Sequence, residues 1–199
     1  MPQEQLSEVN QEKRRTYVKK RLKWSHSRLL FLDETGVNLQ MTRRYARAPK
    51  GQRVYCPVPS RRGVNITICA AISKDGLHAP MRMQGAMNGE VFEAYIEQFL
   101  LPTLRKGDIL IMDNLSVHKR VSLSAIVAKK QAQIVFLPPY SPDLNPIEMM
   151  WAKTKVLLRN YAARTPRALN NAIKKALLQI SKQEIRNYIK HAGYYDTNN

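Results

Sequence analysis

The sequence predicts an α/β domain: a mixed β-sheet flanked by helices, with extra helices at the C-terminal end. Three short apolar runs, Arg28–Asp33, Asp108–Asp113 and Gln133–Leu137, have the length and composition of strands buried on both faces. Further strand patterns follow the first run, whereas helical patterns separate the later two. A series of strands followed by alternating helices and strands is typical of a sheet with both antiparallel and parallel neighbours.

The antiparallel part of the sheet is expected before residue 85. Tyr45–Tyr55, with Pro49-Lys50-Gly51 inside it, is expected to form a strand interrupted by a turn. Gly63–Ser73 is β-branched and apolar, and Leu77–Gln84 is expected to return beside it, because Lys74-Asp75-Gly76 is a hairpin signal. These segments therefore predict a meander of strands in the first half of the chain.

Helices are expected wherever apolar residues recur with a period near 3.6. Asn145 has the character of an N-cap, Pro146 fits the first helical position, and Glu148 falls at the third, which is the spacing of a capping box. The helical segments expected are residues 10–24, the segment from Asn88 to about Pro102, Val117–Lys130, Asn145–Tyr161, a helix opened by Thr165-Pro166, and Ser181–Lys190.

Charge indicates the kind of partner. The 199 residues include 33 Lys and Arg against 15 Asp and Glu, a formal net charge of +18. Such a surplus is typical of proteins that bind a polyanion, most often nucleic acid. Basic residues dominate both flanks, so we expect residues 1–27 to form a basic N-terminal arm or helix and residues 28–195 to form the main domain.

Several classes of protein are not expected. Residues 1–10 are polar and do not resemble a signal peptide, and the longest apolar runs are too short to span a bilayer. Cys56 and Cys69 form no Cys-x-x-Cys motif and are expected to be small buried residues rather than metal ligands. We therefore expect a cytoplasmic, nucleoid-associated protein with no membrane partner.

Two of the predicted strands end in aspartate, at Asp33 and Asp113. Ligands of open α/β sheets collect at the carboxyl ends of strands, so two acids on neighbouring strands would lie close together. Their mutual repulsion favours a bound cation, and oxygen ligands suit Mg²⁺ or Mn²⁺. The segment after the third strand offers a third acid, either Glu148 at a helix start or Asp143 in a turn, and spacing alone leaves both open.

Three motifs together resemble the catalytic domain of the DDE transposases of the mariner superfamily, in its bacterial insertion-sequence branch. They are FLDETGVNLQMTRRYARAPKGQR, ILIMDNLSVHK and LPPYSPDLNPIEMMW. The resemblance implies an RNase H-like fold and identifies Asp33, Asp113 and Glu148 as the catalytic and metal-binding acids. The 34 residues between Asp113 and Glu148 match the spacing of this branch. Asp143 then becomes a positioning residue.

The family implies divalent-metal-dependent cleavage of DNA at transposon ends and strand transfer to target DNA. Two Mg²⁺ or Mn²⁺ ions roughly 3.5–4 Å apart would serve the three acids, and a homodimer or higher oligomer would act on DNA. About 28 residues precede the first strand, too few for the family's helix-turn-helix modules, so a separately encoded recognition protein is a further expected partner. The alternatives are an RNase H-like structure-specific nuclease and a non-enzymatic DNA-binding remnant.

Other side chains are expected to support the acids or to contact DNA phosphates. The supporting residues are Asn114, His118, Asp143 and Asn145. The phosphate-contacting residues are Lys19, Lys20, Arg21, Arg43, Arg44, Arg47, Lys50, Arg53, Lys119, Lys153, Lys155 and Arg159, for which simple solvation is the alternative. Tyr140 is a candidate for stacking on bases, whereas the helical phase of Trp151 favours the core.

Overall fold

The computed structural model describes residues 3–43, 45–114 and 121–194, and it confirms the mixed sheet. Five strands lie in the order β3-β2-β1-β4-β5. β1 pairs antiparallel with β2 and parallel with β4, which in turn pairs parallel with β5. The strands are β1 (Leu29–Asn38), β2 (Asn65–Ser73), β3 (Gly76–Gln84), β4 (Ile109–Met112) and β5 (Gln133–Phe136).

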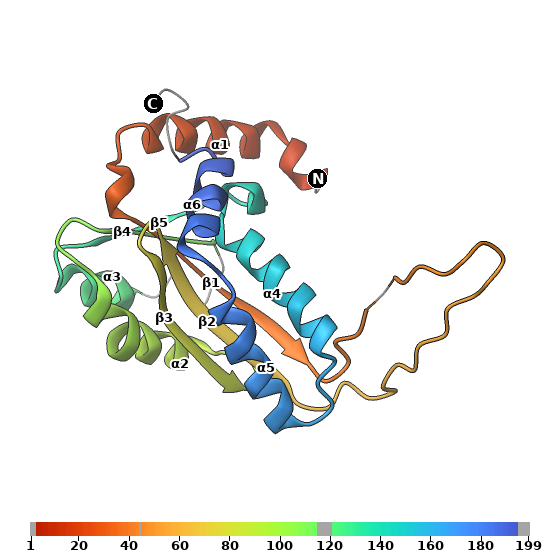
Figure 1. Ribbon diagram of the computed structural model, residues 1–199. Helices are drawn as coiled ribbons and strands as arrows, with labels where there is room; N and C mark the ends of the chain where they lie inside the picture. The colour runs from red at the N-terminus through yellow and green to blue at the C-terminus, as the bar shows by residue number, and fades with distance from the viewer. Residues whose placement is uncertain (1–2, 44, 115–120, 195–199) are drawn as a thin grey trace.

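Helices cover both faces of the sheet (Figure 1). One face carries α4, α5 and α6, and the other carries α2 and α3. The helices are α1 (Glu8–Arg21), α2 (Gly89–Tyr95), α3 (Val121–Ala128), α4 (Ile147–Tyr161), α5 (Pro166–Leu178) and α6 (Lys182–His191), and α2 continues through a π-helical turn at Ile96–Leu100. None of the helices in the described ranges is long and apolar enough to cross a membrane.

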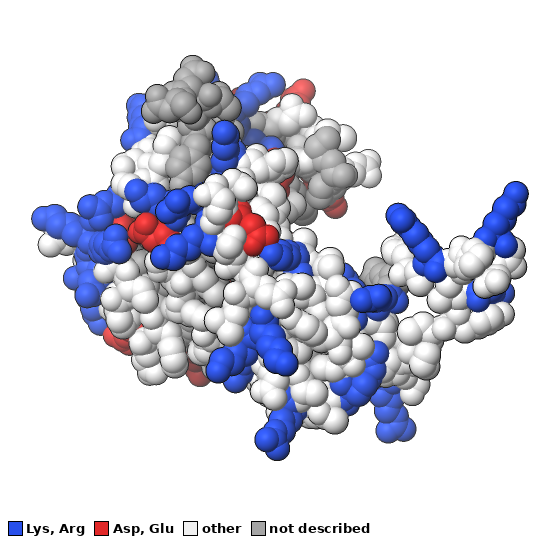
Figure 2. Space-filling view, in the orientation of Figure 1, with Lys and Arg blue, Asp and Glu red and all other residues white. Residues whose placement is uncertain are grey.

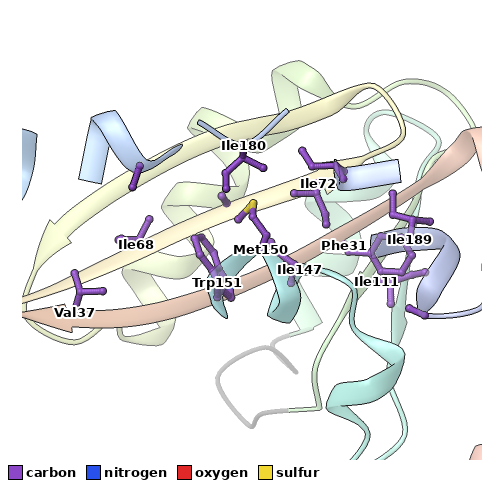
Figure 3. Packing of buried hydrophobic residues seen from close by; sticks show 14 of the residues in the cluster. Phe31, Val37, Ile68, Ile72, Ile111, Ile147, Met150, Trp151, Ile180 and Ile189 are labelled. Carbon is purple, nitrogen blue, oxygen red and sulfur yellow. The ribbon is translucent and has the colours of Figure 1, made fainter. Parts of the chain in front are cut away.

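Alternating side chains of the central strands divide the core into two clusters. Leu29 and Phe31 of β1 pack with α4 and α6, whereas Leu30 and Leu32 pack with α2 and α3. Figure 3 shows the first cluster, in which Trp151 of α4 lies against the sheet and is 1% exposed, as its helical phase predicts. This division decides which strand residues face α4.

The N-terminal basic segment is a helix that docks on the domain rather than an arm apart from it. The Ser7 side chain caps α1 by accepting a hydrogen bond from the Asn10 amide. Tyr17 is buried in the first core cluster and meets Trp24 edge-to-face. Figure 1 shows α1 crossing above α6, near the C-terminal end of the chain.

Three expectations are corrected by the structure. Residues 45–55 form no strand and pair with none of the five strands of the sheet in the described ranges. The segment projects from the domain (Figure 1), although a turn does form where Gln52 donates its amide hydrogen to Pro49. Cys56 lies in this projecting segment and is exposed, whereas Cys69 is buried as predicted. β1 does not end at Asp33 but continues to Asn38, because β2 pairs with it along its whole second half.

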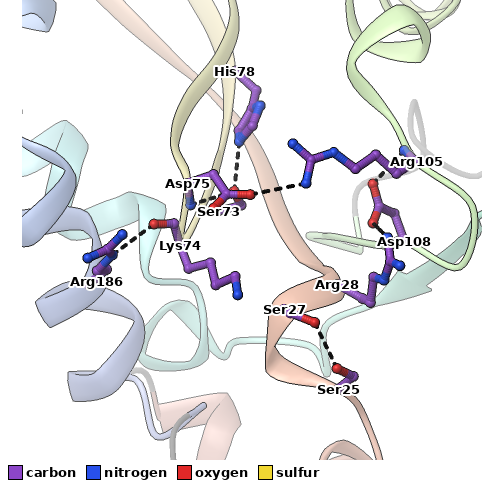
Figure 4. A network of polar contacts seen from close by, with 10 residues as sticks. All are labelled: Ser25, Ser27, Arg28, Ser73, Lys74, Asp75, His78, Arg105, Asp108 and Arg186. Atoms are coloured by element: carbon purple, nitrogen blue, oxygen red, sulfur yellow. Dashed lines mark hydrogen bonds and ion pairs between the residues drawn. The ribbon is translucent and has the colours of Figure 1, made fainter.

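A polar network at the β2–β3 hairpin ties this end of the sheet together (Figure 4). The hydroxyl of Ser73 and Nε2 of His78 lie 2.7 Å apart, and Asp75 is 3.5 Å from the guanidinium of Arg105. The buried carboxylate of Asp108 accepts a hydrogen bond of 2.7 Å from the Arg105 amide. The network therefore fixes the chain just before β4, at the opposite end of this strand from Asp113.

Candidate active site

The sheet places Asp33 and Asp113 on the face that α4 covers. Phe31 and Ile111 are partners in the parallel ladder and both belong to the cluster beneath α4. Asp33 and Asp113 each follow two residues later, so they share that face and adjacent positions. The parallel pairing stops at Phe31 and Ile111, and the two acids therefore lie just past the carboxyl end of the paired segment.

Glu148 reaches the site from the first turn of α4. The expected capping box is absent: Pro146, not Asn145, occupies the N-cap position, and no side chain caps the helix. Asn145 has the extended backbone that an N-cap adopts, with φ −109° and ψ 97°, but its side-chain oxygen is buried and accepts no hydrogen bond. The Glu148 carboxylate is therefore left available for other interactions.

The three acids interact electrostatically. Burial raises the pKa of the Asp33 carboxyl well above its usual range, and the nearby charges of Glu148 and Asp113 raise it further. The amide of Glu34 opposes this by donating a 2.8 Å hydrogen bond to Asp33 Oδ1. The pKa of Glu148 is also raised, first by partial desolvation among neighbouring protein atoms, although its side chain reaches solvent; Lys155 acts against this effect.

A pocket of about 390 Å³ opens between the end of β4 and the start of α4. Asp113 and Glu148 both line it, together with Asn114 and the buried Asn145, whereas Asp33 is 7% exposed and is not among the lining residues. Residues 137–142 complete the wall. In the described ranges no three His, Cys, Asp or Glu side chains already stand at metal-ligand distances from one another. The pocket therefore brings two carboxylates together at one opening, and the buried carboxylate of Asp33 interacts electrostatically with both.

Asp143 does not belong to this carboxylate group. It lies in a 3₁₀ turn, Pro142–Leu144, and its two oxygens accept hydrogen bonds of 2.9 and 2.6 Å from the Arg14 guanidinium of α1. That pairing lowers the pKa of Asp143. Of the two acids that the sequence left open, Glu148 is the one that faces the pocket.

Comparison with known proteins identifies the domain. A family model described as DDE superfamily endonuclease matches residues 28–170. The chain belongs to this family. The DDE domain is 23% identical to the Tc1 transposase of Caenorhabditis elegans, over 92% of this chain and 72% of that protein. It is 25% identical to the Tcb1 transposase of Caenorhabditis briggsae, of whose length it spans 63%.

Solved structures confirm the RNase H-like mixed sheet of this DDE domain. The Mos1 transposase in a paired-end complex with the left transposon end matches with a TM-score of 0.73 at 14% identity, over 94% of this chain and 60% of that chain. The catalytic domain of the Mos1 mariner transposase matches with a TM-score of 0.63 at 12% identity, over 96% and 92% of the two chains. The chain thus spans about three fifths of the Mos1 chain in the paired-end complex and most of its catalytic domain.

The basic residues expected to contact DNA have different surroundings in the DDE domain. Arg21 reaches Ala192 O at 3.0 Å and lies over the Tyr194 ring, and Lys153 pairs with Glu184, so these two cations already have protein partners. Arg43 donates to Asn160 at 2.8 Å. Lys19, Lys20, Arg47, Lys50 and Arg53 are exposed, and Lys155 and Arg159 are partly exposed. Arg44, His118 and Lys119 lie outside the described residues.

Figure 2 shows Lys and Arg side chains across the visible face and along the projecting segment, with only small acidic areas between them. Their assignment as phosphate contacts stays a prediction. Sequence reasoning missed the roles of Arg14, Tyr17 and Tyr194, which hold the turn before Glu148. The only sequence signal for them was an arginine and a tyrosine on a basic helix, which does not single them out.

Proposed function

We propose that this chain cleaves DNA phosphodiester bonds at transposon ends and joins the resulting ends to target DNA, in a reaction that requires a divalent cation. The observation that carries the proposal is the convergence of Asp33, Asp113 and Glu148 from three separate elements onto one side of the sheet. The mutual influence of their charges favours a cation between them. Membership of the DDE superfamily supports the same chemistry.

The donor set suits magnesium or manganese, because all three side chains offer carboxylate oxygens. A bound ion would supply Lewis-acid polarisation of a phosphate and activation of an attacking hydroxyl. The chain itself contributes position: the Glu34 amide donates a hydrogen bond to Asp33, and the fold holds Asp113 and Glu148 in the lining of one pocket. Tyr140, half exposed at the pocket wall, offers a ring on which a flanking base can stack.

The finer assignments belong to the same proposal. The 34 residues between Asp113 and Glu148 favour the bacterial insertion-sequence branch of the mariner superfamily. Mos1 structures described as paired-end complexes, some with Mn or Mg, support proposing that two or more copies of this chain act together on DNA with metal ions. A separately encoded helix-turn-helix protein would supply end recognition, and the site of action would be the nucleoid in the cytoplasm.

Nicking of a supercoiled plasmid tests the proposal. The purified chain is expected to nick with Mg²⁺ or Mn²⁺ and not with EDTA, because the carboxylate ligands need a bound divalent ion. Ca²⁺ is not expected to support nicking, because it is larger and takes about six to eight oxygen ligands in a looser geometry than the octahedral one of Mg²⁺. The Asp113→Asn variant, purified in parallel, controls for contaminating nucleases. Equal cleavage in EDTA would contradict metal dependence, and nicking without joined target products would reduce the function to a nuclease.

A further inference from the structure

The 3₁₀ turn Pro142–Leu144 lies immediately before the helix that carries Glu148, and α1 holds this turn from outside. Arg14 of α1 makes a two-pronged contact with Asp143, at 2.9 and 2.6 Å. Gln5 adds a hydrogen bond of 3.3 Å to the same carboxylate. A guanidinium that donates two parallel hydrogen bonds fixes the orientation as well as the distance of its partner. The N-terminal segment therefore fixes Asp143 in one place.

A second connection holds the other end of the same turn. The hydroxyl of Tyr194 donates a 2.8 Å hydrogen bond to Leu144 O, and the hydroxyl of Tyr17 lies 2.8 Å from that of Tyr194. Because Tyr194 gives its proton to Leu144, Tyr17 is the donor to Tyr194. Both rings are buried, and Tyr194 also meets Phe31 edge-to-face, two residues before Asp33. α1 thus reaches both the turn before Glu148 and the strand of Asp33.

These contacts matter because α4 begins without a side-chain cap. An uncapped first turn leaves its amide groups without local side-chain partners, so its position depends on the segment before it. That segment is the turn held by Arg14 and Tyr194. Glu148 lies on the first turn of α4, four residues after Leu144.

We propose that α1 is a positioning element for the third carboxylate, with Arg14 and Tyr17 as the positioning residues that act on Glu148 through the turn Pro142–Leu144. This inference rests on the proposed function, since it assigns Glu148 a role in binding the cation. The inference gives one residue of the basic helix a role within the protein: Arg14 binds a carboxylate of its own chain and not a DNA phosphate. Outer partners of metal ligands commonly contribute 10–100-fold to metal affinity or activity.

The matched comparison is Arg14→Gln against Arg15→Gln. Both remove one positive charge from α1, but Arg15 is 69% exposed and its ion pair within the described residues is with Glu12 of the same helix. We expect Arg14→Gln to weaken Mn²⁺ binding, measured by electron paramagnetic resonance of the free ion, by roughly tenfold. Arg15→Gln should bind Mn²⁺ like the unchanged chain. The half-maximal Mn²⁺ concentration for nicking should move in parallel.

A charge swap distinguishes loss of the Arg14–Asp143 ion pair from misfolding of the variant. Arg14→Asp combined with Asp143→Arg restores an ion pair across the same gap, and we expect it to recover most of the Mn²⁺ affinity that either single change loses. Hydrogen exchange of the amides at 144–149 should quicken in Arg14→Gln and return toward its original rate in the swap. DNA binding should show the same salt slope in Arg14→Gln as in the unchanged chain, whereas loss of a phosphate contact would reduce that slope by about 0.9.

The outcomes separate this inference from the proposed function. Mn²⁺ binding that is equal in Arg14→Gln and Arg15→Gln would overturn the inference even if the chain nicks DNA. Failure of the unchanged chain to nick, with Mn²⁺ binding still weakened only by Arg14→Gln, would overturn the proposed function and keep the positioning role. A reduced salt slope with unchanged Mn²⁺ binding would return Arg14 to the phosphate-contacting residues.

Discussion

Two helices of this protein begin with the same local pattern and use it differently. At α6, Ser181 and Glu184 form a complete capping box, in which each side chain bonds the other's backbone amide. At α4, Asn145 and Glu148 stand at the same spacing, yet neither caps the helix. The difference lies in the side chains, because Ser181 and Asn145 both have extended backbone. The Ser181 hydroxyl accepts a hydrogen bond from the Glu184 amide, whereas the Asn145 side-chain oxygen is buried without a partner and the α4 cap position falls to Pro146.

The comparison shows how a glutamate becomes available for chemistry. Glu184 accepts hydrogen bonds from Lys153 and from Ser181, and these contacts lower its pKa to about 2. Glu148 has no capping duty, and its pKa is raised, first by partial desolvation. One helix start thus stabilises the fold, and the other holds an acid beside the pocket at some cost in free energy.

The largest expected effect separates the two glutamates by activity. Glu148→Gln should reduce metal-dependent nicking by on the order of 10³-fold, because an amide lacks the charge that holds the cation. Glu184→Gln, the matched control, should nick normally, since Glu184 caps α6 and pairs with Lys153 but does not line the pocket. Melting curves of both variants check that each folds. A Glu148→Gln variant with normal nicking would remove Glu148 from the site.

The next largest expected effect is on stability, to which Glu184 contributes and Glu148 does not. Glu184→Ala should lower the free energy of unfolding by roughly 1–2 kcal/mol, through loss of the capping box and of the Lys153 pair, whereas Glu148→Ala should not. Because folding lowers the pKa of Glu184 from about 4.5 to about 2, its contribution is present above pH 4.5 and disappears as the pH falls toward 2. Urea titrations at pH 7 and pH 2 measure this, and a Glu184→Ala deficit that persists at pH 2 would contradict it.

The smallest expected effect is a gain in stability on substitution of Asp33. Folding raises the pKa of Asp33, so its ionised form destabilises the metal-free protein at neutral pH, and the penalty is relieved as the pH falls through the raised pKa. Asp33→Asn should therefore increase the free energy of unfolding by roughly 1 kcal/mol in EDTA, while activity is lost. Thermal melting at pH 7 measures the gain, and added Mn²⁺ should stabilise only the unchanged chain. If Asp33→Asn melts at a lower temperature than the unchanged chain in EDTA, the expected gain in stability is wrong.

Much of the fold could be read from local patterns. The β2–β3 hairpin follows from its turn residues, and helices begin at Thr165-Pro166 and at Ser181 as predicted. The failures have a common cause. Residues 45–55 have strand-like composition but pair with none of the strands in the described ranges. Asn145 has the residue type and the extended backbone of a cap, but its side-chain oxygen accepts no hydrogen bond. In both places the surroundings outweigh a local preference.

The sequence by itself determined most of the strands and helices and the basic character of the chain, because residue type and spacing carry those signals, and its motifs led to the proposal of the three acids. Only the tertiary structure decided that Asp33 is buried and interacts electrostatically with Glu148, and that Arg14 binds Asp143, 129 residues away. Such contacts join segments that no local periodicity connects. Their geometry depends on how the sheet, α1 and α4 pack together, and the order of residues along the chain does not give that arrangement.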